Sequence, residues 1–145
     1  MTKLKNLKGT KIQFIDADPV EYVGVWSSGG AMNTAGAELA GAGVQTAALS
    51  ISGKVYPPGG SVVNVESYDG TSYSEITEVN VGRIDACAFG TSTATFFATG
   101  NTQPPFVASV ARWNGSSWTE TTDTNTDRNA AGSYTQLTLP TIHPL

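Results

Sequence analysis

The sequence repeats itself with a period of 45 to 47 residues, and this repeat limits the possible fold more than any other feature does. ESYDGTSYSE (Glu66 to Glu75) is echoed by ARWNGSSWTE (Ala111 to Glu120), 45 residues later. Upstream, GVQTAALSISG (Gly43 to Gly53) is matched by GTSTATFFATG (Gly90 to Gly100), 47 residues later. A period of this length is typical of proteins that pack many copies of one supersecondary unit against each other.

Each period predicts four short antiparallel strands. Asp69-Gly70 and Asn114-Gly115 separate runs rich in β-branched and aromatic residues, a pattern typical of β-hairpins with type I′ turns. No segment has apolar residues at helical spacing over three turns, so we expect an all-β fold with almost no helix. One four-stranded sheet cannot bury both of its faces, whereas copies packed around an axis can, as in a β-propeller.

Four aromatic residues recur at fixed places in the repeat, and we expect them to pack between neighbouring sheets. They are Tyr68, Tyr73, Trp113 and Trp118. The single cysteine, Cys87, lies in the apolar run DACAF and is expected to be a small buried hydrophobic residue.

These residues resemble the kelch-type propeller repeat and, more narrowly, the kelch-like repeats of tailed-phage virion proteins. In those proteins W-S-S-G-G-x-M-N-T-A-R precedes an Ala/Gly/Thr-rich strand and then Y-D-G-T-S-W-T-E. This chain has WSSGGAMNTAG (Trp26 to Gly36), AGAGVQTAAL (Ala40 to Leu49), YDGTSYSE (Tyr68 to Glu75) and WNGSSWTE (Trp113 to Glu120). The opening, LKNLKGTKIQFIDADPVEYVG (Leu4 to Gly24), resembles the lead-in of such proteins.

The chain departs from this pattern at three places. Gly36 stands where the phage phrase has Arg, and Tyr73 where it has Trp. The Gly-Gly doublet that closes the second strand is reduced to Ser52-Gly53 in one repeat and Thr99-Gly100 in the other. The resemblance implies a kelch-like propeller in a virion structural protein assembled in the host cytoplasm.

The repeats predict three parts along the chain: an amino-terminal arm at residues 1–18, kelch-like repeats at 19–139 and a tail at 140–145. The arm is expected to attach the chain to other virion proteins. With no signal peptide and no apolar span of 18 residues, we expect neither secretion by a standard signal nor membrane insertion.

Within the repeats, residues 37–76 and 83–121 each predict a whole blade. Residues 19–26 supply only a third and fourth strand, and residues 130–139 only a first and second. About three blade equivalents cannot close a ring, because propellers use about four to eight blades. We therefore expect a homodimer in which residues 130–139 of one chain complete residues 19–26 of another. Pairing with a different virion chain, or an open array of sheets, is the alternative.

Charge and ligand chemistry exclude several functions. The net charge of −4 argues against a nucleic-acid partner. The only histidine, His143, has no second ligand at metal-binding spacing. Asp16 with Asp18, and Asp123 with Asp127, could hold Ca²⁺ with added carbonyl groups, but the EF-type loop with its later Glu is absent. We expect no catalytic residue, no metal site and no cofactor.

Binding remains, and loops are where recognition concentrates on a rigid fold. Residues 54–60 and 101–106 are the longest interruptions between strands, and each carries an aromatic residue beside a Pro-Pro pair. The candidate ligand-binding residues are Tyr56, Pro57, Pro58, Pro104, Pro105 and Phe106. In the alternative interpretation, Pro-Pro only shapes the loop.

The favoured function is a non-enzymatic virion protein for decoration or for adhesion to host glycans. A carbohydrate-active enzyme on the same fold and an intracellular protein-interaction module are the alternatives.

Overall fold

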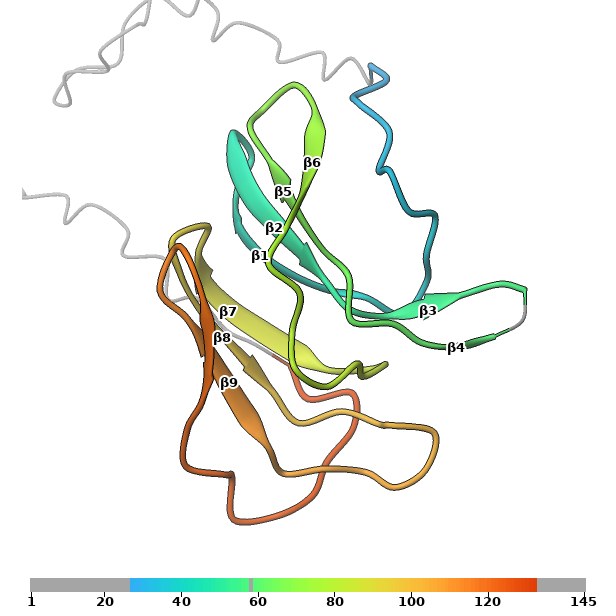
Figure 1. Ribbon diagram of the computed structural model, residues 1–145, viewed down its shortest axis with the longest axis vertical. Coiled ribbons are helices and arrows are strands. Elements are labelled where there is room, and N and C mark those ends of the chain that lie inside the picture. The colour runs from blue at the N-terminus through green and yellow to red at the C-terminus, as the bar shows by residue number, and fades with distance from the viewer. Residues whose placement is uncertain (1–26, 58, 133–145) are drawn as a thin grey trace, which may run out of the picture.

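The computed structural model describes residues 27–57 and 59–132, and this part of the chain is all-β with no helix, as predicted (Figure 1). The first four-stranded antiparallel sheet contains β1 (Ala40–Val44), β2 (Ala47–Ile51), β5 (Val65–Tyr68) and β6 (Tyr73–Ile76). The second contains β7 (Cys87–Thr91), β8 (Ala94–Ala98), β9 (Val110–Trp113) and β10 (Trp118–Glu120). A small hairpin joins β3 (Lys54–Val55) to β4 (Gly60–Ser61). The predicted arm, the strands at 19–26, most of 130–139 and the tail lie outside the described residues.

The two sheets repeat one another down to the backbone angles. In each sheet the strands follow one another in chain order, and the non-glycine residues with positive φ fall at equivalent places. Glu38 and Asp85 have φ of 56° and 51°, two residues before β1 and β7 respectively, and Ala130, 45 residues after Asp85, has φ of 48°. Ser52 and Thr99 have φ of 57° and 58°, just after the second strand. The sequence repeat is therefore a conformational repeat in the two sheets, and the backbone angle of Ala130 matches it.

The change in period from 47 to 45 residues arises in one connection. Lys54 pairs with Ser61 in the first repeat, and Asn101 pairs with Phe106 at the equivalent place in the second. The second connection is thus two residues shorter, and the strands on either side keep their register. Loop length can change here without disturbing the sheets, as expected for a surface connection.

Glycine is required where the first two strands of each sheet turn. Gly43 and Gly90 have φ of 121° and 127°, in a region that residues with a side chain rarely adopt. A Cβ atom at Gly90 would overlap the carbonyl oxygen of Ala94, and one at Gly43 would overlap that of Ala47. Both glycines let the hairpin strands approach closely before a two-residue loop.

The Asp-Gly and Asn-Gly pairs form hairpins, as predicted, but not the predicted type I′ turn. Tyr68 pairs directly with Tyr73, so the loop contains four residues, and Asp69 and Asn114 do not have positive φ. Instead, Asp69 Oδ1 accepts hydrogen bonds from the N–H groups of Thr71 and Ser72, each at 2.8 Å. A side chain that mimics a backbone acceptor stabilises this wider loop.

The loop at Asp69 is expected to respond to acid, whereas its counterpart at Asn114 cannot titrate. The amide donors of Ser72 and Thr71 lower the pKa of the Asp69 carboxyl below its usual value. The ionised form therefore stabilises the fold above the ordinary carboxyl range, and this stabilisation is lost as the pH falls through the lowered pKa. Asp69→Asn should unfold at lower urea concentration than the wild type at about pH 6, and the difference should close towards about pH 2.5.

Urea midpoints at several pH values test this expectation, with Asn114→Asp as the matched variant. That substitution should introduce the same acid-sensitive stabilisation into the second repeat, because Asn114 Oδ1 accepts the N–H groups of Ser116 and Ser117, each at 2.9 Å. A difference between Asp69→Asn and wild type that stays constant across the range would contradict it.

The core lies between the two sheets, whose first strands, β1 and β7, lie closest together (Figure 1). Leu49, Ile51 and Val65 of the first sheet share one apolar cluster with Phe97 and the two tryptophans of the second. The Trp118 indole Nε1–H donates to the carbonyl of Thr77 at 3.0 Å. This bond links the second sheet to the residue that follows β6 of the first sheet.

The prediction that the recurring aromatic residues pack between neighbouring sheets is confirmed for the second repeat, whereas for the first repeat it stays a prediction. Trp113 and Trp118 are buried between the sheets, with ring centroids 5.2 Å apart. Tyr68 and Tyr73 form an equivalent pair, 4.7 Å apart, but the strand register places them on the face of the first sheet that points away from the second. Cys87 is buried, as predicted.

Candidate functional site

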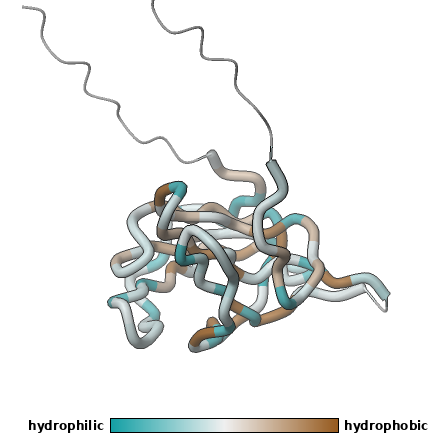
Figure 2. Tube along the Cα trace, turned by 90° about the horizontal axis from the view of Figure 1, so that it is seen from above, coloured by the Kyte–Doolittle hydropathy of each residue, from teal (hydrophilic) through white to brown (hydrophobic). Residues whose placement is uncertain are grey.

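The two connections that carry the candidate binding residues project on the same side of the fold (Figure 1). Hairpin β3–β4 extends from the first sheet, and residues 101–106 extend from the second. Figure 2 shows hairpin β3–β4 projecting beyond the rest of the fold in a second view. The backbone N–H of Ser61 donates to Gln103 Oε1 at 3.2 Å, so the two connections touch. We call residues 54–61 and 101–106 the loop edge.

The loop edge exposes an aromatic residue from each repeat. Tyr56 is 60% exposed and Phe106 is 49% exposed. Pro57, Pro104 and Pro105 are also exposed, whereas Pro58 lies outside the described residues. The structure therefore brings the candidate residues of both repeats to one edge of the molecule, which the sequence alone did not establish.

Local hydrogen bonds fix the second half of the loop edge. The N–H and Oγ1–H groups of Thr102 both donate to the carbonyl of Pro105, at 3.0 and 2.9 Å. The N–H of Gln103 donates to Asn101 Oδ1 at 2.7 Å. A surface held in this way loses little conformational entropy when it binds a partner.

A charged group accompanies the aromatic ring in the first half. Lys54 Nζ lies 4.8 Å from the centroid of the Tyr56 ring, within the range of a cation–π contact. Tyr56 is also the main cause that raises the pKa of the Lys54 ammonium above its usual value. The loop edge thus offers exposed rings, one ammonium group and backbone polar groups, which suit stacking and hydrogen bonding to a polar ligand.

The candidate metal ligands of the sequence are not brought together in the described part of the chain. Within residues 27–57 and 59–132, no three His, Cys, Asp or Glu side chains come close enough together to hold a metal ion. Asp123 and Asp127 lie in this part, whereas Asp16, Asp18 and His143 lie outside it. The candidate site considered below is the loop edge.

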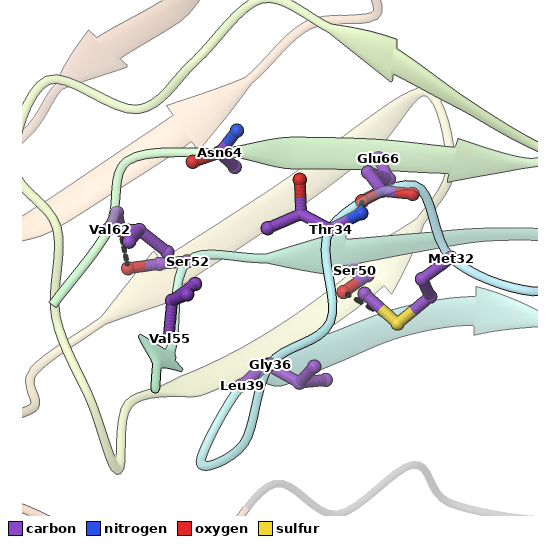
Figure 3. A pocket seen from close by; sticks show the side chains of 10 residues that line it. All are labelled: Met32, Thr34, Gly36, Leu39, Ser50, Ser52, Val55, Val62, Asn64 and Glu66. Atoms are coloured by element: carbon purple, nitrogen blue, oxygen red, sulfur yellow. Dashed lines mark hydrogen bonds between the residues drawn. The ribbon is translucent and has the colours of Figure 1, made fainter. Parts of the chain in front are cut away.

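A small cavity lies between residues 32–36 and the first sheet (Figure 3). Its volume is about 10 Å³, room for about one water molecule. The side chains around it include Met32, Ser50, Ser52 and Glu66. Ser52 Oγ lies 2.6 and 2.8 Å from the carbonyl oxygens of Val62 and Arg83, which share its one hydroxyl proton.

Glu66 is a buried anchor that sequence analysis did not single out. Its side chain is 2% exposed, and its carboxylate accepts the N–H groups of Asn33 and Thr34 at 2.8 and 2.7 Å. Asn33 Nδ2 donates to the same carboxylate at 3.3 Å and to the carbonyl of Tyr73 at 3.1 Å. Glu66 therefore fastens residues 33 and 34 across the first sheet. The available signal was that Ala111 occupies the equivalent place in the second repeat.

Arg83 was also missed, although it joins the two sheets. Its backbone N–H donates to Ser52 Oγ at 2.7 Å, while its Nη1 donates to the carbonyls of Thr99 and Ser109 at 3.1 and 2.6 Å. The guanidinium carbon lies 4.3 Å from the centroid of the Phe97 ring, and the residue as a whole is 1% exposed. Burial lowers its pKa, opposed by Glu120 and Asp123. Its equivalent in the first repeat is Gly36, which borders the small cavity of Figure 3.

No family model and no curated protein matches the sequence. Among the described residues there is no helix long and apolar enough to cross a membrane. Inferences about function therefore depend on the repeat, the fold and the loop edge.

Proposed function

We propose that the chain is a non-enzymatic component of a phage virion, built from kelch-like propeller blades, that decorates the particle or binds glycans on the host surface. The blade interpretation is supported by two sheets of the same four-stranded order, packed face to face with their first strands closest together. Radial packing of such units is how propellers bury sheets that are apolar on both faces. The virion assignment is supported by the phage-like phrases WSSGGAMNTAG and YDGTSYSE.

The observation that carries the binding function is the loop edge. Tyr56 and Phe106 are exposed on two connections that touch each other and stand on rigid sheets. Aromatic rings offer large contact area at low cost in conformational entropy, and the apolar faces of sugar rings fit against them. Lys54 beside Tyr56 adds a preference for acidic sugars. Residues 1–18, outside the described part, are proposed to attach the chain to other virion proteins.

The proposal predicts that the full chain binds an acidic bacterial surface polysaccharide, and that Tyr56→Ala or Phe106→Ala weakens binding at least about tenfold. An array of purified capsular and lipopolysaccharide glycans measures the affinity. Val44→Ala is the control, because Val44 is an exposed apolar residue outside the loop edge. Binding that is equal in all four proteins, or no binding to any glycan, would refute a role for the loop edge.

The virion assignment is tested separately, by mass spectrometry of purified phage particles. Peptides of this chain should be present in particles and should survive the washing steps that remove host proteins. Their absence would refute the virion role even if the loop edge bound glycans. Release of new reducing ends from a bound polysaccharide would instead favour an enzyme.

A further inference from the structure

The face of the second sheet that points away from the first is apolar and open. Phe89 and Phe96 are 43% and 37% exposed, and their rings stack at 5.5 Å with an interplanar angle of 20°. Arg112 of β9 is exposed and pairs with Phe96, so these three residues form one row across the sheet. A surface hollow of about 340 Å³ adjoins the row and is bordered by Cys87, Phe89, Arg128 and Gly132 among others. We call this surface the Phe89–Phe96 face.

The equivalent face of the first sheet is covered by another sheet. Ala42 and Leu49 of the first sheet occupy the places of Phe89 and Phe96, and there they pack against the second sheet. Leu49 is only 3% exposed as a result. By position, the Phe89–Phe96 face is the surface on which a following sheet rests, and paired exposed phenylalanines are costly to leave in water.

The chain that leaves the second sheet already follows the path of a following repeat. The N–H of Gly100 donates to the carbonyl of Arg128 at 2.7 Å, as that of Gly53 donates to the carbonyl of Arg83 at 3.0 Å. The N–H of Ala130 donates to the carbonyl of Asp85 at 2.7 Å, as that of Asp85 donates to Glu38. Arg83 inserts beneath the second sheet, whereas its equivalent, Arg128, is exposed beside the hollow. Gly132, the last described residue, therefore lies beside the Phe89–Phe96 face.

Residues 30–36 show where a preceding sheet would lie on the opposite face of the two-sheet unit. Gly30 lies against the backbone of Thr71. In the second repeat the equivalent pair is Thr77 and Ser116, and Thr77 Oγ1 donates to the carbonyl of Ser116. Residues 77–83 connect the last strand of the first sheet to the second sheet. Residues 30–36 thus occupy the place of a connection that arrives from the last strand of a preceding sheet. That preceding sheet belongs on the face of Tyr68 and Tyr73.

We propose that the sheet on the Phe89–Phe96 face is shared with a second copy of this chain. Residues 133–145 of one copy supply its first two strands, and residues 19–26 of the other copy supply its third and fourth. Thirteen residues suffice for the hairpin, because β7, β8 and their turn span residues 87–98. The two half-sheets belong on opposite outer faces of one unit, and joining them within a chain would give a ring of three, fewer than propellers use. Two copies give six sheets and cover both open faces of each chain.

The mass of the full chain in solution is the first test. Light scattering after size exclusion should give a dimer. Phe89→Asp should raise its dissociation constant at least about a hundredfold, because a charge buried beneath residues 133–145 would displace the strands that pair with the other copy. Phe106→Asp, which changes an exposed phenylalanine on the loop edge, should leave the dimer intact. Far-ultraviolet circular dichroism and a cooperative urea transition show whether each variant is folded, and Phe89→Ser serves if the aspartate variant does not fold. A monomeric wild type, or a dimer unaffected by folded Phe89 variants, overturns the proposal.

Photo-crosslinking decides which segments meet at the seam. A benzophenone residue replaces Phe89 or Arg112 in the full chain, and ¹⁴N- and ¹⁵N-labelled copies are refolded together. At position 112, above the outer strands, the crosslink should reach residues 19–26 of the other copy. At position 89 it should reach residues 133–145 of the same copy. Crosslinks from position 112 to residues 19–26 of the same copy would overturn the shared sheet. Because neither measurement involves a glycan, this inference and the proposed binding function fail independently.

Discussion

Phe97→Ala is expected to lower the free energy of unfolding by about 3–5 kcal/mol. Phe97 is fully buried on the face of β8 that lies between the two sheets. Its ring meets the edge of Trp118 at a centroid distance of 6.2 Å and covers the guanidinium of Arg83. Truncation would therefore leave a cavity at the centre of the core and would also remove the surface against which a buried cation packs.

Urea unfolding followed by tryptophan fluorescence measures this loss, at one fixed protein concentration so that assembly does not alter the comparison. Phe106→Ala is the matched control, because Phe106 is a half-exposed phenylalanine on the loop edge. That variant should lie within about 0.5 kcal/mol of the wild type. Equal losses in the two variants would contradict a core centred on Phe97.

The sheets could be predicted because their signals are local. Asp69-Gly70 and Asn114-Gly115 mark hairpins, and the spacing of equivalent residues fixes one sheet per period. The turn type was wrong because the sequence does not reveal that Asp69 and Asn114 side chains accept backbone hydrogen bonds within a wider loop. Loop length, unlike strand pairing, is decided by such individual contacts.

Burial could not be predicted from the repeat, since equivalent residues meet different neighbours. Tyr68 and Trp113 occupy the same place in their sheets, yet only Trp113 faces another sheet in the described structure. From the sequence alone, Arg83 would be expected to be an exposed charged residue. It is buried instead, with its backbone bonded to the first sheet and its side chain to the second. The departure at Gly36 was visible in the sequence, but the small cavity beside it was not.

The candidate site was predicted in part. Aromatic residues beside Pro-Pro pairs identified both connections, and Tyr56 and Phe106 are indeed exposed. That the two connections adjoin depends on how the sheets pack, and on the bond between Ser61 and Gln103, which joins residues 42 positions apart. A single sequence contains no local signal for such a contact.

Glu66→Ala is expected to lower the free energy of unfolding by about 2–3 kcal/mol, because it deprives three nitrogen donors of their acceptor. It should also release the segment that runs across the first sheet. Hydrogen exchange at the Asn33 and Thr34 amides should accelerate far more than exchange in β8, since only the former donate to Glu66.

Glu66→Gln is the control that separates this anchoring from packing. The amide keeps the shape of the side chain and one carbonyl acceptor. The loss in free energy of unfolding should therefore be about half of that in Glu66→Ala, and the Asn33 and Thr34 amides should stay partly protected from exchange. Glu75→Ala, which truncates the exposed glutamate opposite Glu66 on β6, should change neither stability nor exchange. If Glu66→Ala behaved like Glu75→Ala, the carboxylate would not hold the segment. Residues 30–36 would then have no fixed path from a preceding sheet, and nothing would orient residues 19–26 towards the face of Tyr68 and Tyr73.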